Sequence, residues 1–253
     1  MHCVSLELVE VSPKIRCYVR PGTSDMKALQ EVTKKRVYDL SKQVDEKRKL
    51  PSGMVWCDCG ANIGAFTLWA LLENGSPKVY AFEPEEENCR LLEVNLYLND
   101  CDKQVELFRQ PVSLKSESYD LYMAKDPNNK WRHTILPVKR RTSVRGLESS
   151  VGLQDFLKQH ADVTAVKMDI EGSEAKIIEG VTDWCNVQYL VFEWHFDRKD
   201  DVGKLSDLSR FKAAMENLRK HFQVVSHRVI PENETHWRWY PPATVVVCQR
   251  MIL

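Results

Sequence analysis

The sequence has no excess of charge of either sign, and it has no long apolar run. Its 36 basic and 36 acidic side chains cancel over 253 residues. This balance gives no electrostatic reason to expect nucleic acid or an anionic membrane as the main partner. No apolar stretch approaches the length that crosses a bilayer, and the first residues lack the basic and apolar regions of a signal peptide. We therefore expect no membrane span.

The sequence also lacks any pattern of metal-binding or paired cysteines. Eight cysteines are present, but none forms a C-x-x-C pair, and their scatter resembles neither a zinc knuckle nor a disulfide framework. Cys57 and Cys59 stand two apart in a strand-like run, so they would point to the same side of a sheet. We interpret them as small buried apolar side chains. Because unpaired thiols are typical of a reducing compartment, we expect a cytoplasmic location.

Apolar runs alternate with helix-like segments from residue 54 onward. The strand-like runs are 54–58, 78–84, 104–109, 163–169 and 187–194, and the helix-like segments are 65–73, 86–99, 173–181 and 205–222. Continuous apolar strands separated by helices indicate a parallel sheet covered on both faces. Two more strand-like runs, 223–230 and 243–250, predict an antiparallel end. The expected fold is a doubly wound, Rossmann-like α/β sheet, mostly parallel with an antiparallel terminal strand.

The first fifty residues follow a different pattern. Residues 6–21 read as short strands, and residues 24–50 read as one helix capped by Ser24 or Asp25. We predict an N-terminal extension over residues 1–50, packed on a core domain over residues 51–253. In the core, the irregular stretch between the third and fourth strands contains two candidate hairpin strands, at 119–124 and 136–144.

The first core strand ends at Asp58 and leads into a turn with Gly60 and Gly64. Glycines permit a close backbone approach, and the N-terminus of the following helix exposes N–H groups that can hold phosphate or carboxylate. The D-x-G-x-x-x-G spacing matches neither the dinucleotide motif G-x-G-x-x-G nor a Walker loop. An acid here would repel a pyrophosphate, but it suits a ligand with an amino group beside a carboxylate, as in S-adenosylmethionine.

A second acid, Glu83, ends the next strand. At that position a carboxylate can accept hydrogen bonds from both ribose hydroxyls and select against a 2′-phosphate. The plainer alternative is that Asp58 caps a helix and that Glu83 is a solvated strand end. The two acids and the glycine turn together favour the nucleoside site.

The fourth and fifth strands end in further acids. Asp169 ends the fourth strand and Glu171 follows it, at the crevice where a transferable group would emerge. In the fifth strand, alternation sends Glu193 and His195 to one face. Helix capping is an alternative role for Glu171, and His195 has the alternative of an ordinary surface histidine. Glu171, Glu193 and His195 are the candidates for a catalytic base.

Five motifs follow one another along the chain: YVRPGTSDMKALQEV, DCGANIGAFTLWA, VYAFEPEEENCRLLEVNLYLN, VTAVKMDIEGSEAKIIEGV and LVFEWH. Together they resemble the FkbM-type methyltransferases, a branch of the S-adenosylmethionine-dependent class I enzymes. The resemblance spans about residues 18–196. It departs at Cys57 and Cys59, where the family often has Ile or Val, and in the tail ETHWRWYPPATVVV.

The resemblance implies S-adenosyl-L-methionine as the cofactor, together with a role for each matching residue. The methionine portion would be held by Asp58, Gly60, Ala61 and Asn62, the ribose by Glu83, and the adenine by Pro84, Val112 and Ser113. Asp169 would lie near the methionine end and Glu171 toward the substrate. Asp25, in the lead-in, would help to close the site.

Methyl transfer to a hydroxyl on a small molecule or glycan is the working hypothesis. In-line displacement from a sulfonium needs mainly alignment and a base within reach, for which Glu171, Glu193 and His195 are the candidates. No N-P-P-Y-like motif follows the fourth strand, which argues against methylation of amino groups on adenine or glutamine. The hypothesis uses no metal, although a variant in which Asp169, Glu171, Glu193 and His195 bind a cation is an alternative.

Other classes of protein remain as alternatives. They are a non-catalytic S-adenosylmethionine-binding protein, an NAD-linked oxidoreductase, and a methyltransferase acting on a peptide or nucleic acid. The basic run at 138–145 would serve the nucleic-acid alternative, although the neutral total charge disfavours it. The acceptor and the oligomeric state are left open by the sequence.

Overall fold

A seven-stranded sheet forms the centre of the computed structural model, which describes residues 5–38, 52–124, 128, 133–136, 141–146, 149–196, 208–227 and 243–250. In spatial order its strands are β12 (Val224–His227), β13 (Ala243–Gln249), β11 (Tyr189–His195), β10 (Ala165–Met168), β3 (Trp56–Cys59), β4 (Val79–Phe82) and β5 (Val105–Phe108). The neighbours from β11 to β5 pair in parallel, whereas β13 is antiparallel to both β11 and β12. The prediction of a mostly parallel sheet with an antiparallel terminal strand is confirmed.

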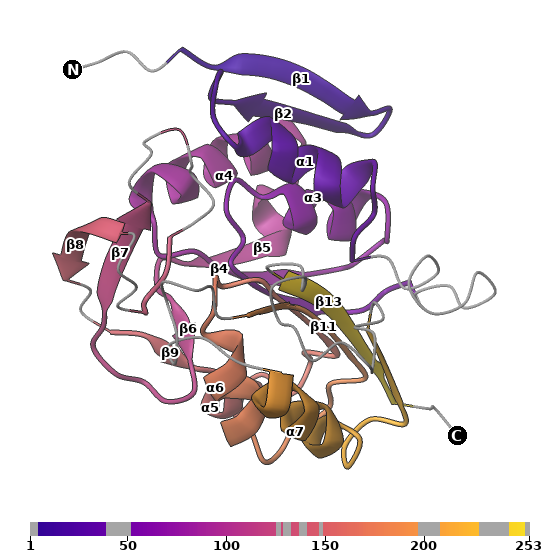
Figure 1. Cartoon of the computed structure of the whole chain (residues 1–253). Helices are drawn as coiled ribbons and strands as arrows, with labels where there is room; N and C mark the ends of the chain where they lie inside the picture. Colours follow the sequence, from indigo (N-terminus) through magenta and orange to yellow (C-terminus); the bar gives the residue numbers. More distant parts are fainter. Residues whose placement is uncertain are drawn as a thin grey trace.

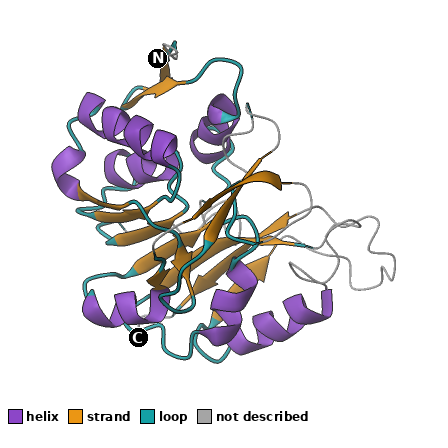
Figure 2. Cartoon of the chain, turned by 90° about the vertical axis from the view of Figure 1, so that its left-hand side faces the viewer, coloured by secondary structure: helices purple, strands orange, loops and turns teal. Residues whose placement is uncertain are grey.

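Helices cover both faces of this sheet (Figures 1 and 2). One face packs against α3 (Ala65–Leu72), α4 (Glu86–Leu98) and α1 (Asp25–Thr33), and the other against α5 (Leu153–Gln159), α6 (Glu174–Gly180) and α7 (Leu208–Leu218). Every residue of β3, β4 and β10 is buried, as expected for strands covered on both sides. The fold is therefore doubly wound.

The cysteines of the first core strand are part of the packing. Cys57 and Cys59 have no exposed surface, and both face the apolar cluster under α5, α6 and α7. The described cysteines are free thiols, and all of them except the half-buried Cys185 are buried. This agrees with their interpretation as small apolar side chains.

The N-terminal segment forms a hairpin and a short helix that lie against α3 and α4 (Figure 1). Strands β1 (Glu7–Ser12) and β2 (Ile15–Val19) are antiparallel, and the side chain of Asn95 in α4 bonds the backbone of Tyr18 in β2. The predicted single helix over 24–50 is wrong in length. Helix α1 ends at Thr33, shortly before Arg36 takes a left-handed φ of 51°, which a continuous helix cannot contain.

Between the third and fourth core strands the chain makes two small strand pairs. β6 (Val112–Ser113) pairs with β9 (Val151–Gly152), and β7 (Asp120–Ala124) pairs with β8 (Arg141–Gly146). A short 3-10 helix, η1 (Asp102–Gln104), precedes β5. The second predicted hairpin strand, 136–144, thus lies further along the chain at 141–146. Part of the basic run at 138–145, and the aromatic tail up to residue 242, lie outside the described residues.

Within the described ranges, every helix is too short or too polar to span a lipid bilayer. The sheet reverses its direction of winding between β3 and β10, since β4 and β5 extend to one side and β11 to the other. In open α/β sheets, ligands bind outside the carboxyl ends of the strands at such a point. The loops after β3, β4, β10 and β11 are therefore the place to look for a site.

Candidate active site

A cavity of about 260 Å³ lies at this point of the sheet. Its wall is formed by the loops after β3, β4 and β10, the end of β11 and one side of α1. Ten of the residues predicted for the site line it: Gly60, Ala61, Asn62, Glu83, Pro84, Val112, Asp169, Glu171, Glu193 and His195. Three are absent from its wall: Asp25, Asp58 and Ser113.

The turn after β3 passes very close to the strand beside it. Gly60 has a φ of 81°, and a Cβ built there would lie 2.0 Å from the carbonyl oxygen of Asp169. The backbone N–H groups of Gly60 and Ala61 donate to the carbonyl of Phe82 at 2.9 Å. Any side chain at position 60 would therefore push the turn away from β10, so glycine is required there.

Asp58 lies beneath this turn instead of in the cavity. Its side chain has no exposed surface and accepts a hydrogen bond of 2.7 Å from Thr67 Oγ1. Its other oxygen lies 3.1 Å from Nζ of Lys167, which also donates to the carbonyl oxygen of Gly60 at 2.8 Å. The acid at the end of the first strand is therefore already neutralised by a lysine of the chain.

Lys167 is the main residue of the site that the sequence reasoning missed. Burial is the largest single effect and would lower the pKa of its ammonium, but the carboxylates of Asp58 and Asp169 together raise it. In the parallel pairing of β10 with β3, Lys167 stands opposite Asp58. The available signal was a lysine inside an otherwise apolar strand, which needs a buried acidic partner.

Glu83 is placed on the cavity wall with little exposed surface. Its carboxylate accepts hydrogen bonds of 2.9 Å from the backbone N–H groups of Asn62 and Glu85. Burial raises its pKa to about 7, although these two backbone donors oppose the shift. A buried carboxylate held by backbone donors at the wall is well placed to accept further hydrogen bonds from a ligand.

Ser113 and Asp25 are used elsewhere in the fold. The hydroxyl of Ser113 bonds to Ser150, within the loop region beside β6 and β9. Asp25 is fully buried and pairs with the guanidinium of Arg20 at 2.8 Å, and Arg20 in turn donates to Asn88 at 2.7 Å. Asn88 does line the cavity, so Asp25 contacts the wall only through this chain of bonds.

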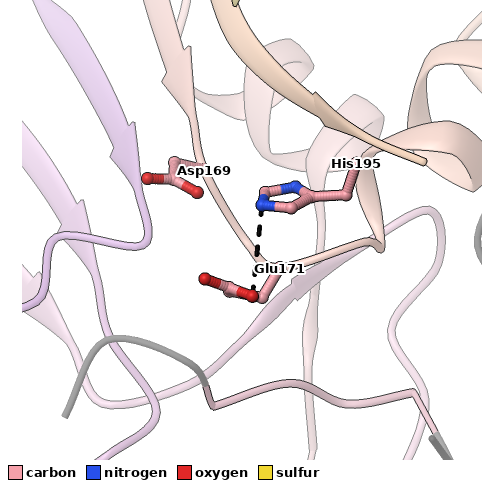
Figure 3. Close-up of side chains that lie close together, drawn as sticks. All are labelled: Asp169, Glu171 and His195. Atoms are coloured by element: carbon pink, nitrogen blue, oxygen red, sulfur yellow. Dashed lines mark ion pairs between the residues drawn. The ribbon is translucent and has the colours of Figure 1, made fainter. Parts of the chain in front are cut away.

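The acids after β10 and the end of β11 meet at one side of the cavity. Figure 3 shows Asp169, Glu171 and His195 turned toward one another, with His195 Nε2 at 4.0 Å from a Glu171 oxygen. The other imidazole nitrogen, Nδ1, lies 3.3 Å from a carboxylate oxygen of Glu174. Tyr38 donates its hydroxyl to Asp169 at 2.9 Å. Tyr38 belongs to none of the sequence motifs, so no signal pointed to it.

The backbone around Glu171 is shaped to present its side chain. Glu171 has a left-handed φ of 56°, and its carbonyl accepts a hydrogen bond of 2.9 Å from Thr134 Oγ1. The carboxylate of Glu174 accepts hydrogen bonds of 2.8 Å from the N–H groups of Ile170 and Gly172, which closes the loop into a tight bend. The capping role considered for Glu171 thus falls to Glu174.

Burial and crowding of these acids shift their protonation. Burial raises the pKa of Glu193 to about 8, and the carboxylate of Asp169 adds to the shift while His195 opposes it. Burial alone would lower the pKa of His195, but Glu174 raises it well above its ordinary value. At neutral pH, the site without a ligand therefore favours a charged imidazole and a mostly protonated Glu193.

Comparison with known proteins supports a methyltransferase. The sequence model described as "Methyltransferase FkbM domain" matches residues 58–224. The methyltransferase sdnD of Sordaria araneosa is 28% identical over 176 residues, which are 57% of this chain and 67% of that protein.

Solved structures of lower similarity include a methyltransferase FkbM from Methylobacillus flagellatus, with a TM-score of 0.47 and 15% identity over 80% of this chain and 45% of that one. Another is a precorrin-6y C5,15-methyltransferase from Geobacter metallireducens, with a TM-score of 0.42 and 14% identity over 87% and 89% of the two chains. The matched residues 58–224 make up well over half of the chain and contain most of the cavity wall. The chain belongs to the FkbM methyltransferase family and is an S-adenosylmethionine-dependent methyltransferase.

Proposed function

We propose that the enzyme transfers the methyl group of S-adenosyl-L-methionine to a hydroxyl on a small molecule or glycan, by in-line displacement. The observation that carries the proposal is the cavity at the switch point of the sheet, with Glu83 at one side and the cluster around Glu193 at the other. The cofactor spans these two places, so that its ribose lies at Glu83 and its methyl group near the acids.

The residues of the first half of the cavity suit the nucleoside. The two ribose hydroxyls donate to Glu83, whose carboxylate Asn62 and Glu85 already hold in place. The adenine ring packs against Pro84 and Val112, which line the same wall. The amino group and carboxylate of the methionine portion lie at the turn of Gly60 to Asn62 and near Asp169.

Asp58 acts on the cofactor indirectly in this proposal. Because it holds Lys167, and Lys167 holds the carbonyl oxygen of Gly60, it fixes the turn against which the methionine portion rests. Asp25 acts in the same way through Arg20 and Asn88, and Ser113 through the loop that carries Val112.

Glu193 is the base that we assign to the reaction. It faces the cavity beside Asp169 and His195, and its raised pKa of about 8 makes the ionised carboxylate a stronger base than an ordinary one, although most molecules carry it protonated at neutral pH. The acceptor oxygen attacks the methyl carbon, forming a C–O bond as the C–S bond breaks. The electron pair of that bond stays on the sulfur of S-adenosylhomocysteine, and the hydroxyl proton passes to Glu193. His195 and Glu171 orient the acceptor.

The charge of the site restricts the acceptor. The carboxyl groups of Asp169, Glu171 and Glu193 line the part of the cavity where the acceptor would bind. An anionic acceptor would be repelled by this wall, whereas a neutral molecule with several hydroxyls can donate hydrogen bonds to it. A polyol, a glycan or a neutral phenol therefore fits better than a phosphate or a nucleic acid.

Mass spectrometry of extracts tests the proposal. Extract from the source organism is incubated with the enzyme and S-adenosylmethionine that carries a deuterated methyl group, and labelled products are identified. We expect label on oxygen and a strong loss of product with Glu193→Gln. Glu106→Gln, which removes an exposed acid on β5, is the matched control and retains activity. Label on nitrogen or carbon would overturn the choice of oxygen. Tight binding of the cofactor without any product would favour the non-catalytic alternative.

A further inference from the structure

The acidic side of the cavity carries more negative than positive charge. The side chains of Asp169 and Glu171 line this side, and the buried carboxylate of Glu174 lies next to His195. Lys167 is already paired with Asp58 at 3.1 Å. Uncompensated charges in a half-buried site are costly, so a bound cation would stabilise this arrangement.

Three of these groups converge on one point. A carboxylate oxygen of Asp169, one of Glu171 and an imidazole nitrogen of His195 all lie within 4.8 Å of one another. Ligand atoms about 2.1 Å from a shared cation lie about 3 Å apart when adjacent and about 4.2 Å when opposite. Small side-chain rotations would bring the three ligand atoms to these distances. Figure 3 shows that the three side chains come from two strand ends and face the same space.

Two of the three groups are oriented by neighbouring side chains, as the ligands of a bound metal usually are. The imidazole nitrogen Nδ1 of His195 faces Glu174 at 3.3 Å, which leaves Nε2 directed toward Glu171. A histidine that binds a metal usually has its second nitrogen oriented by a carboxylate in this way. Asp169 is held by the hydroxyl of Tyr38 at 2.9 Å.

A second, independent observation points to a bound group at this wall. Ser173 lines the same cavity with only 3% of its surface exposed. Its hydroxyl has no hydrogen-bond partner among the described residues. Buried hydroxyls are normally satisfied, so a ligand or a cation-bound water is the missing partner.

From this geometry we infer that Asp169, Glu171 and His195 bind one divalent cation, which in turn binds the acceptor hydroxyl. His195 binds through Nε2 as the neutral imidazole, so binding of the cation releases the proton that the imidazole carries without it. Two carboxylates and one imidazole suit a cation of the manganese type better than a purely oxygen-seeking one. Three protein ligands leave coordination positions open for the acceptor and for water. Asp169 would then stand between the cation and the methionine end of the cofactor.

The consequence for catalysis rests on the proposed function, but the binding of the cation does not. A bound cation lowers the pKa of a coordinated hydroxyl and fixes its oxygen in line with the methyl group. The C–O bond then forms and the C–S bond breaks as described above, with the proton leaving by the same route. The cation is neither oxidised nor reduced in the reaction.

Titration of the full chain with Mn²⁺ tests the inference. The protein is freed of metals with a chelator, and binding is followed by calorimetry and by the loss of the free Mn²⁺ signal in electron paramagnetic resonance. We expect one site per chain, weakened at least tenfold by His195→Ala and by Glu171→Gln. His221→Ala, at a half-buried histidine between α7 and β12, is the matched control and retains the site.

A parallel titration with S-adenosylhomocysteine separates the two hypotheses. Variants that bind it like the parent are folded, so their loss of Mn²⁺ binding reports the site itself. A parent protein that binds S-adenosylhomocysteine but no Mn²⁺, Mg²⁺ or Zn²⁺ overturns the cation site and leaves the proposed function standing. Cation binding that is unchanged in His195→Ala overturns the site as well. A parent protein that does not bind S-adenosylhomocysteine would instead count against the proposed function.

Discussion

Cofactor binding should depend on pH because Glu83 must give up its proton first. In the free protein, burial raises the pKa of the Glu83 carboxyl to about 7. In the proposed binding mode the ribose hydroxyls donate to the ionised carboxylate, so the complex would favour the charged form. Protonation of the free protein therefore competes with the ligand, and affinity falls as the pH falls through 7.

The size of the effect follows from the ionised fraction. With a pKa of about 7, the carboxyl is about 9% ionised at pH 6 and about 91% ionised at pH 8. If only the ionised form binds, the dissociation constant of S-adenosylhomocysteine is about tenfold higher at pH 6 than at pH 8. This difference corresponds to about 1.4 kcal/mol.

Calorimetric titration of S-adenosylhomocysteine at several pH values between 6 and 8 measures this directly. Glu83→Gln removes the titrating group, so its dissociation constant should not show the tenfold change between pH 6 and pH 8. Its affinity at pH 8 should be lower than that of the parent. Glu106→Gln, an exposed acid on the neighbouring strand, should keep the slope of the parent. The reasoning is refuted if the parent and Glu83→Gln show the same dependence on pH.

Two further predictions concern the parts that support the cavity. Lys167→Met leaves the buried charge of Asp58 without its partner, so urea denaturation should show a free energy of unfolding lower by about 3–5 kcal/mol. Adding Asp58→Asn should recover much of this loss. A loss below about 1 kcal/mol would contradict the pairing. Gly60→Ala should abolish binding of S-adenosylhomocysteine in calorimetry, because its Cβ would meet the Asp169 carbonyl at 2.0 Å. Gly22→Ala is its control, with a similar φ of 72° but open space around the new Cβ; equal effects of the two variants would count against the steric argument.

The core of the fold could be predicted because its strands carry their own signal. β3, β4 and β10 are buried on both faces, so their sequences are mainly apolar, with Asp58 and Lys167 as a buried pair. The positions of Gly60 and Glu83 on the cavity wall followed from the same regularity, since loops at the carboxyl ends of parallel strands meet at one edge.

Pairings between distant segments could not be predicted in the same way. Asp58 was expected to face a ligand, but its partner Lys167 is brought opposite only by the register of two strands that are far apart in the chain. The sequence around Arg36 has charged residues that favour a helix, but the backbone turns there with a left-handed φ, and Tyr38 just after it is buried and bonds Asp169. Tertiary contacts decided both outcomes.

The hydrogen bond from Tyr38 to Asp169 joins residues 131 positions apart. With Lys27 and Glu31 of α1, Tyr38 forms a part of the cavity wall that lies ahead of the conserved-domain match beginning at residue 58. A recombinant piece cut to that match would lack these three wall residues and would leave the Asp169 carboxylate without the hydrogen bond from Tyr38.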